Sequence, residues 1–198
     1  MFNDLSSLRS FLATRRSCKP RDLIEPGPSV DELRQIVALA SRSPDHGKLH
    51  PWRFVHVPRS ARADFAALLQ RAYLKDRPSP GRLEIEANEA FAHQAPELVV
   101  VLSAPRESKI PAWEQELSCG AACLNLLMAA TALGYGAGWV TGWAAYSDEV
   151  RTVFGREDQR IAGFVFFGTP KGELEERDRP TLEEVFSEWL AQNWPAEA

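Results

Sequence analysis

The chain has 198 residues, of which 44% are hydrophobic, 10% aromatic and 25% charged, and its formal net charge is −4. This length fits one domain, and the composition is that of a folded globular protein. Charges of both signs are interspersed, so we expect no broad basic face for nucleic acid or anionic lipid. The first residues form neither a signal-peptide core nor a membrane span, and the odd count of three cysteines suits a reducing cytoplasm, where we expect the protein.

The N-terminal quarter of the chain predicts two helices and a strand. Apolar residues at three- and four-residue steps predict an amphipathic helix over about Asp4–Arg16. The capping-box spacing of Ser29–Glu32 predicts the start of a second helix, which Pro44 ends. A turn-rich loop over 43–51 then leads to a strand over 52–57, which is rich in aromatic and β-branched residues.

The middle of the chain predicts a helical pair followed by a buried strand. Helical patterns over 60–73 and 83–91 are separated by a Pro-Ser-Pro-Gly sequence at 78–81. We therefore expect the segment over about 71–93 to be a flap. The continuous apolar run over 98–102 predicts a strand covered on both faces.

The C-terminal part begins with a long apolar helix predicted over 113–133, which in a small domain needs cover from a partner subunit. We expect a flexible connection over 134–139, a short helix capped by Ser147, and a buried strand over 161–167. A capping-box sequence at Thr181 predicts a final helix. Its apolar residues, expected to face inward, are Leu182, Val185, Phe186 and Trp189.

Arg15, Arg16 and Ser17 lie together at the end of the first predicted helix. Two guanidinium groups and a hydroxyl can hold a phosphate monoester without a glycine-rich loop. Arginines in a last helical turn also complement the helix dipole, however, and are usually solvated. Taken without the rest of the chain, the segment favours this structural role.

A polar loop over 42–52 is bracketed by prolines and precedes a predicted buried strand, a frequent position for ligand-binding loops. Its His46 and His50 have a four-residue spacing, but they lie on a loop and Pro51 follows directly, so we do not expect a metal site. We do not expect a serine hydrolase either, because the chain lacks a Gly-x-Ser-x-Gly sequence.

The glycine-rich sequence over 134–138 superficially resembles a dinucleotide-binding turn. It ends a predicted helix and precedes a strand, which is the reverse of the order that holds a pyrophosphate, so a Rossmann site is excluded. Trp139, considered alone, is interpreted as a core residue.

Taken together and in this order, these segments resemble the nitroreductase family, particularly its compact bacterial branch of NAD(P)H nitroreductases. The resemblance spans nearly the whole chain. The segments that carry it are Arg15-Arg16-Ser17, Arg42-Ser-Pro-Asp-His46, His50-Pro51-Trp52, Trp113-Glu-Gln-Glu116, Gly134-Tyr-Gly-Ala-Gly-Trp139 and Gly168-Thr-Pro170. It implies a single α+β domain over residues 1–198, with a central, mainly antiparallel sheet flanked by helices, in an interlocked homodimer.

The resemblance also implies noncovalent FMN at the subunit interface. The residues implied at the flavin phosphate and ribityl chain are Arg15, Arg16 and Ser17. Those implied along the isoalloxazine are Trp139, Val140 and Thr141. Arg42 and His46 would come from the partner subunit. Members of the family often supply a late arginine to the phosphate, for which Arg177 and Arg179 are candidates and Arg179, directly before Pro180, is preferred.

The end of the long helix is implied to lie near the nicotinamide nucleotide, through Ala129, Ala130, Thr131, Ala132, Leu133 and Gly134. NADH or NADPH would give hydride to the flavin, which reduces a small-molecule acceptor such as a nitroaromatic or quinone, with no catalytic acid or base required from the protein. Val140 departs from the branch, which often has a basic residue there. Two alternatives stay open: a flavin-binding carrier or sensor without turnover, and a different flavin-dependent redox reaction on the same fold.

Overall fold

The computed structural model describes residues 1–189, and residues 190–198 of the expected single domain lie outside that range. The strands are β1 (Leu23–Ile24), β2 (Trp52–His56), β3 (Glu97–Ser103), β4 (Gly136–Val140) and β5 (Arg160–Pro170). The α-helices are α1 (Leu8–Thr14), α2 (Val30–Ala40), α3 (Arg62–Asp76), α4 (Arg82–His93), α5 (Ala112–Ala132), α6 (Trp143–Tyr146), α7 (Asp148–Phe154) and α8 (Leu182–Val185). Short 3-10 helices precede β1 (η1, Pro20–Asp22) and α3 (η2, Arg59–Ala61).

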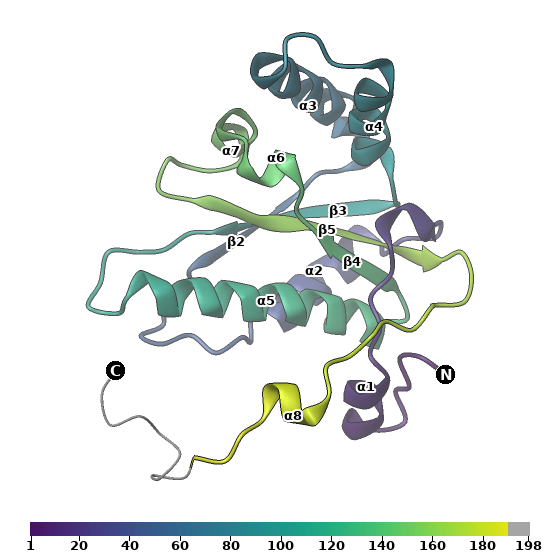
Figure 1. The fold of residues 1–198 in the computed structure, drawn as a ribbon, viewed down its shortest axis with the longest axis vertical. Helices are drawn as coiled ribbons and strands as arrows, with labels where there is room; N and C mark the ends of the chain where they lie inside the picture. The colour runs from purple at the N-terminus through teal and green to yellow at the C-terminus, as the bar shows by residue number, and fades with distance from the viewer. Residues whose placement is uncertain (190–198) are drawn as a thin grey trace.

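The strands form one sheet in which every pairing is antiparallel. Its order is β1-β5-β3-β2, and β4 also pairs with β5. Strand β5 is the longest strand and pairs with three others, β3, β4 and β1. Helices cover both faces of this sheet (Figure 1). The predicted α+β fold with an antiparallel sheet is confirmed.

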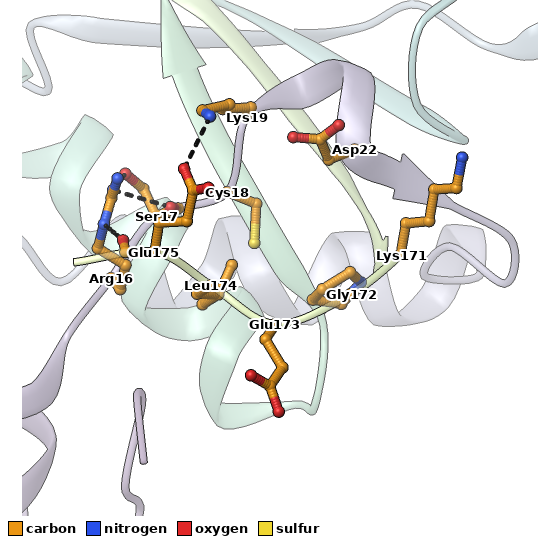
Figure 2. A pocket seen from close by; sticks show the side chains of 11 residues that line it. Arg16, Ser17, Cys18, Lys19, Asp22, Lys171, Gly172, Glu173, Leu174 and Glu175 are labelled. Carbon is orange, nitrogen blue, oxygen red and sulfur yellow. Dashed lines mark hydrogen bonds and ion pairs between the residues drawn. The ribbon is translucent and has the colours of Figure 1, made fainter. Parts of the chain in front are cut away.

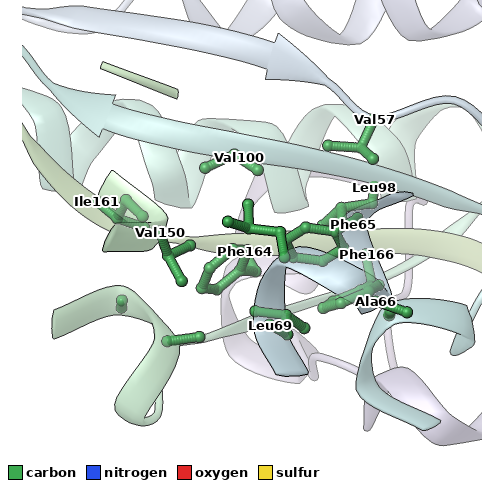
Figure 3. Packing of buried hydrophobic residues seen from close by; sticks show 14 of the residues in the cluster. Val57, Phe65, Ala66, Leu69, Leu98, Val100, Val150, Ile161, Phe164 and Phe166 are labelled. Atoms are coloured by element: carbon green, nitrogen blue, oxygen red, sulfur yellow. The ribbon is translucent and has the colours of Figure 1, made fainter. Parts of the chain in front are cut away.

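Strand β3 is buried on both faces, as its apolar run predicts. Successive side chains of a strand point to opposite faces. Leu98 and Val100 therefore contact the core that also holds Phe65 of α3 and Phe164 of β5 (Figure 3). Val99 points to a second core, which α2 and α5 cover on the opposite face. The sheet thus separates a helical layer of α3, α4, α6 and α7 from a layer of α2 and α5.

Arg62 is a buried arginine at the base of the α3–α4 hairpin, only 3% exposed. Its Nε donates to the Val57 carbonyl at 2.9 Å, and its terminal nitrogens donate to the carbonyls of Ala92 at 2.9 Å and Pro96 at 3.3 Å. Burial lowers the pKa of Arg62 to about 10. The side chain joins the segments before α3, at the end of α4 and before β3, so the hairpin is fixed to the sheet at its base.

The first helix is shorter than the predicted Asp4–Arg16. It begins after Ser7, whose hydroxyl caps it, and ends at Thr14. Phe11 is the buried residue of this helix, so little packing supports a longer one. Arg15 already has extended backbone, with ψ of 127°. The arginines thus follow the helix, which removes the helix-dipole interpretation for them.

The predicted flexible connection over Gly134–Trp139 is wrong, because most of it is strand β4. Glycine disfavours strands, so a glycine-rich sequence predicts a loop. In the fold, the Cys18 N–H donates to the Ala137 carbonyl at 2.8 Å. A Cβ on Gly138 would lie closer than 3.0 Å to the Cys18 carbonyl oxygen. The glycines are needed because the segment around Cys18 crosses directly over β4.

The last helix is confirmed at its start, where Thr181 and Glu184 form a capping box, but it has only four residues. The prediction that its apolar side chains face inward is wrong for the single chain. The residues concerned are 62% to 68% exposed: Leu182, Val185, Phe186 and Trp189. The segment that carries α8 lies away from the sheet (Figure 1), so these side chains contact no core formed by residues 1–189.

The long apolar helix is confirmed as α5, and Gly134, with φ of +90°, follows its end as predicted. One face of α5 lies in the second core. The opposite face leaves large apolar side chains exposed: Trp113, Leu117 and Leu124. No helix among the described residues is both long and apolar enough to cross a membrane. This second apolar face of α5 lacks cover within the described chain.

Replacement of Arg62 by Ala is expected to lower the free energy of unfolding by roughly 2 to 4 kcal/mol, because three buried carbonyls lose their donor. Urea denaturation followed by circular dichroism measures this change. Arg59→Ala is the matched control, because Arg59 is an exposed arginine paired with Glu25, and such pairs contribute about 0 to 1 kcal/mol. Equal losses for both variants would contradict a structural role of Arg62.

Candidate functional site

The structure brings three distant parts of the chain together beside β4. The extended segment over 15–18 is joined to β4 by the Cys18–Ala137 hydrogen bond. The guanidinium of Arg179 donates to the Arg15 carbonyl at 3.4 Å. Arg15, Arg16, Ser17 and Arg179 therefore lie together beside the strand that ends with Trp139 and Val140. Of the two late arginines, Arg179 is the one that contacts this segment.

Arg16 fixes the returning C-terminal segment in place (Figure 2). Its Nε donates to the Glu175 carbonyl at 2.7 Å, and one terminal nitrogen donates to the Ser17 carbonyl at 3.0 Å. The Lys19 ammonium adds an ion pair with the Glu175 carboxylate at 3.2 Å. Arg16 is thus already committed to backbone carbonyls, which is a positioning role that its sequence context does not reveal.

A cavity of about 390 Å³ lies between these two segments (Figure 2). Its lining includes Arg16, Ser17 and Cys18 on one side and Lys171, Glu173 and Glu175 on the other. Burial raises the pKa of the Cys18 thiol, which keeps the sulfur protonated. The cavity includes neither Trp139 nor His46, so it covers only one end of the site expected from the sequence.

Arg15 differs from its neighbour in having an uncommitted guanidinium. Arg15 is half-buried, and its side chain has no hydrogen bond or ion pair with any residue in the range 1–189. Nearby, the Arg177 backbone N–H, with smaller contributions from the charges of Arg179 and Arg16, holds the pKa of Glu176 below its usual value. A half-buried guanidinium that pairs with no carboxylate of residues 1–189 fits a phosphate monoester, which accepts charge-assisted hydrogen bonds.

The residues at the end of β4 differ in what they can offer a ligand. Trp139 is 39% exposed, and its indole N–H donates to the Ala162 carbonyl at 3.0 Å, so its interpretation as a core residue is wrong. Val140 packs its side chain against the first core and leaves mainly backbone for contact. Thr141 is half-buried. This arrangement offers an aromatic surface and backbone groups.

The loop over 41–51 is fixed to α5 by side chains that the sequence alone does not single out. Ser43 is buried, and its hydroxyl accepts a hydrogen bond from Asn125 at 2.8 Å. Ser118 donates to the Pro44 carbonyl. The Asp45 carboxylate accepts hydrogen bonds from two backbone N–H groups later in the loop, those of Leu49 at 3.0 Å and His50 at 2.8 Å. The loop that carries Arg42 and His46 is therefore ordered.

His46 and the arginine segment lie at opposite ends of α5 in one chain. The His46 Nδ1 lies 2.7 Å from Glu114 Oε2, in the first turn of α5. The arginine segment contacts Ala137, just beyond the other end of this helix. At 1.5 Å per residue, Glu114 and Ala132 are about 27 Å apart along the axis. The structure therefore does not bring His46 and Ser17 to one site within a single chain.

The expected nicotinamide-binding residues at the end of α5 fall into two groups. Ala129 and Ala130 are buried in the second core, so their side chains contact the protein interior. Ala132 and Gly134 are exposed and can face a ligand. Of the remaining two, Thr131 and Leu133 are half-buried, and the Thr131 hydroxyl donates to the Leu127 carbonyl at 3.0 Å.

Comparison with known proteins agrees with this fold. The profile of the Nitroreductase family matches residues 12–169. The chain is 35% identical over 162 residues to "Putative NAD(P)H nitroreductase YdjA" of Escherichia coli strain K12, covering 81% of this chain and 86% of that protein.

Solved structures share the fold. A nitroreductase-like family protein from Bacillus cereus superposes with a TM-score of 0.79 at 19% identity, over 96% of this chain and 99% of the other. A nitroreductase with bound FMN from Bacteroides fragilis superposes with a TM-score of 0.67 at 20% identity, over 90% and 96% of the two chains. The profile match over most of the sequence, joined to an antiparallel sheet with helices on both faces, shows that this chain belongs to the nitroreductase family.

Proposed function

We propose that the chain is an FMN-dependent NAD(P)H oxidoreductase that reduces a small-molecule acceptor such as a nitroaromatic or a quinone. The observation that carries the proposal is the convergence of Arg15, Ser17 and Arg179 beside β4, the strand that also carries the exposed Trp139. Phosphate donors next to an aromatic surface match the two ends of a flavin nucleotide. The family and the names of its relatives support the nicotinamide donor.

The protein's own residues bind and orient in this proposal. Arg15, Ser17 and Arg179 hold the phosphate by charge-assisted hydrogen bonds, and Arg16 keeps the segment of Arg179 in place. Trp139 and the backbone of Val140 and Thr141 would hold the ring. Bound FMN would supply the redox chemistry, the transfer of reducing equivalents from the nicotinamide to the acceptor. No side chain of this site has to transfer a proton for that chemistry.

The nicotinamide donor is proposed to approach near the end of α5, where Ala132 and Gly134 are exposed. Ala129 and Ala130 support this end from the core, and Thr131 and Leu133 lie between the two groups. A reduced nicotinamide donor and three buried free cysteines both fit a reducing compartment, and we place the protein in the cytoplasm.

We further propose a homodimer in which each flavin site is shared. The exposed face of α5 presents Trp113, Leu117 and Leu124, a surface suited to a partner subunit. The arginine segment and His46 lie at opposite ends of this helix, so a two-fold axis across α5 would bring the His46 end of one subunit to the Ser17 end of the other. Arg42 and His46 would then complete the partner's site.

The proposed flap, over about residues 71–93, comprises the end of α3, the 77–81 connection and α4 of the α3–α4 hairpin. The hairpin contacts the segment that follows Thr141, because Tyr73 packs on Trp143 at a ring separation of 4.9 Å and the Trp143 indole N–H donates to Asn88 at 3.1 Å. We propose that it limits the size of the acceptor rather than the retention of FMN.

The test of the proposed function is the absorption spectrum of the purified protein, followed by steady-state NADPH and NADH oxidation with an added quinone. We expect flavin bands and turnover that depends on the quinone. A colourless protein that rejects added FMN would refute the assignment. A yellow protein that oxidises neither nucleotide would be a flavin carrier or sensor instead.

Replacement of residues 78–80 by two glycines is expected to change kcat/KM for large acceptors relative to small ones, while the dissociation constant of FMN stays within about twofold. Replacement of the exposed residues 156–158, which precede β5, by two glycines is the control. Weaker FMN binding with an unchanged acceptor range would remove the hairpin from this role.

A hybrid dimer tests the shared site. Arg15→Ala/Ser17→Ala and Arg42→Ala/His46→Ala variants, each shown to fold and to bind FMN poorly, are unfolded, mixed and refolded, and the hybrid is isolated with two affinity tags. One hybrid site then carries both lesions and the other carries none, so we expect about one FMN per dimer from two-fold symmetry. A dimeric hybrid that stays empty would defeat the shared site and leave the FMN assignment standing.

A further inference from the structure

Strand β5 contains an irregularity directly opposite the end of β4. Val101 of β3 pairs with Gly163, but the next residue of β3, Leu102, pairs with Ile161. Ala162 therefore has no partner on β3, and β4 ends its pairing at Phe164. This is a β-bulge, a feature that locally interrupts the ladder and redirects backbone groups.

The backbone carbonyl at the bulge is used by Trp139. Because Ala162 has no partner residue in the ladder, its carbonyl is available, and it accepts the hydrogen bond from the Trp139 Nε1–H at 3.0 Å. An indole N–H usually finds an acceptor when the ring is partly buried. Here the acceptor is a backbone atom of the sheet, so the orientation of the ring is set by the fold itself.

The residue after the bulge leaves space for the indole ring. A Cβ on Gly163 would lie closer than 3.0 Å to both Nε1 and Cδ1 of Trp139. A glycine inside a strand weakens it and often marks a close approach of another group. At this position that group is the indole, so any larger residue would displace Trp139 from the Ala162 carbonyl.

We infer that Gly163 and the Ala162 carbonyl form a positioning device that holds the Trp139 indole in one orientation as a rigid surface for the isoalloxazine ring. The inference rests on the proposed function for the identity of the ligand. Two features carry it: a bulge that frees an acceptor, and a glycine that the indole covers. A ring held before binding loses little conformational freedom when a ligand stacks on it, so it contributes more affinity than a mobile one.

The first test concerns the apoprotein and does not depend on any flavin. In ¹⁵N-labelled protein, the Trp139 indole signal is assigned by its loss in Trp139→Phe, and its hydrogen exchange is measured. We expect Gly163→Ala to shift this signal and speed its exchange. Gly27→Ala is the matched control, because its Cβ would meet the Pro96 side chain at 2.5 Å and its nearest contacts are with Pro96 and Glu97 rather than with Trp139. An indole signal that Gly163→Ala leaves unchanged would overturn the positioning device.

The second test measures FMN dissociation constants. We expect Gly163→Ala and Trp139→Ala each to bind FMN about tenfold more weakly, the loss typical of one aromatic contact. The double variant should be no more than about twofold weaker than Trp139→Ala, because both changes remove the same contact. Wild-type affinity in Gly163→Ala, or losses that multiply in the double variant, would contradict the inference.

A third variant covers the case in which Gly163→Ala fails to fold. Trp139→Phe keeps Gly163 and an aromatic ring but lacks the N–H donor, and we expect an FMN affinity between those of wild type and Trp139→Ala. An affinity equal to wild type would refute the role of the Ala162 carbonyl. A wild-type protein that rejects FMN would refute the proposed function and the flavin role of Trp139, whereas the exchange measurement would still decide whether the indole is anchored.

Discussion

The hydrogen bond from Cys18 to Ala137 is the contact on which the candidate site depends. It carries the N-terminal segment across β4 at backbone distance, which requires strand residues without side chains on that face. A Cβ on Gly136 would lie 2.7 Å from the Cys18 sulfur, and one on Gly138 would overlap the Cys18 carbonyl. Without this crossing, Arg15 and Ser17 would have no fixed relation to Trp139.

The returning C-terminal segment depends on the same crossing. The position of Cys18 fixes that of Arg16, two residues earlier, and the Arg16 guanidinium donates a hydrogen bond to the Glu175 carbonyl. Arg179 then reaches the Arg15 carbonyl from the far end of the described chain. One backbone contact therefore orders groups that are more than 160 residues apart in sequence. These segments lose their conformational entropy when the sheet folds. Little further entropy is therefore lost when a ligand binds to them.

Elements with local signals could be predicted from the sequence. Ser29 and Glu32 form the capping box that starts α2, and the apolar run at 98–102 is the buried centre of β3. β4 could not be predicted in this way, because its glycines serve a tertiary contact that opposes local propensity. The prediction for residues 182–189 was wrong for another reason: their apolar pattern is present, but no surface of residues 1–189 covers these side chains.

In the candidate site, too, the sequence alone could not predict the roles of individual residues. Arg15 and Arg16 are identical neighbours in sequence, yet Arg16 is bonded to backbone carbonyls and Arg15 is uncommitted. Only the fold distinguishes them. The family resemblance implied the site residues as a group. Gly163 was not among them, and its sequence gives only a weak indication of a role, because it is a lone glycine in a predicted strand. Only the structure explains this glycine, because the indole of Trp139 occupies the space that a Cβ at position 163 would need.

The length of α5 links cofactor binding to assembly. The two ends of α5 carry different halves of the proposed site. Within one subunit these halves are too far apart to form a complete site. A ligand that needs both halves binds the dimer and not the separated subunits, and it must therefore stabilise the dimer by its own binding free energy. The exposed apolar side chains of α5 supply attraction between subunits, whereas the ligand supplies the charge and ring contacts at the two ends. Dimer stability should consequently rise with flavin concentration, and a change at the Arg15 end should weaken the assembly only when flavin is present.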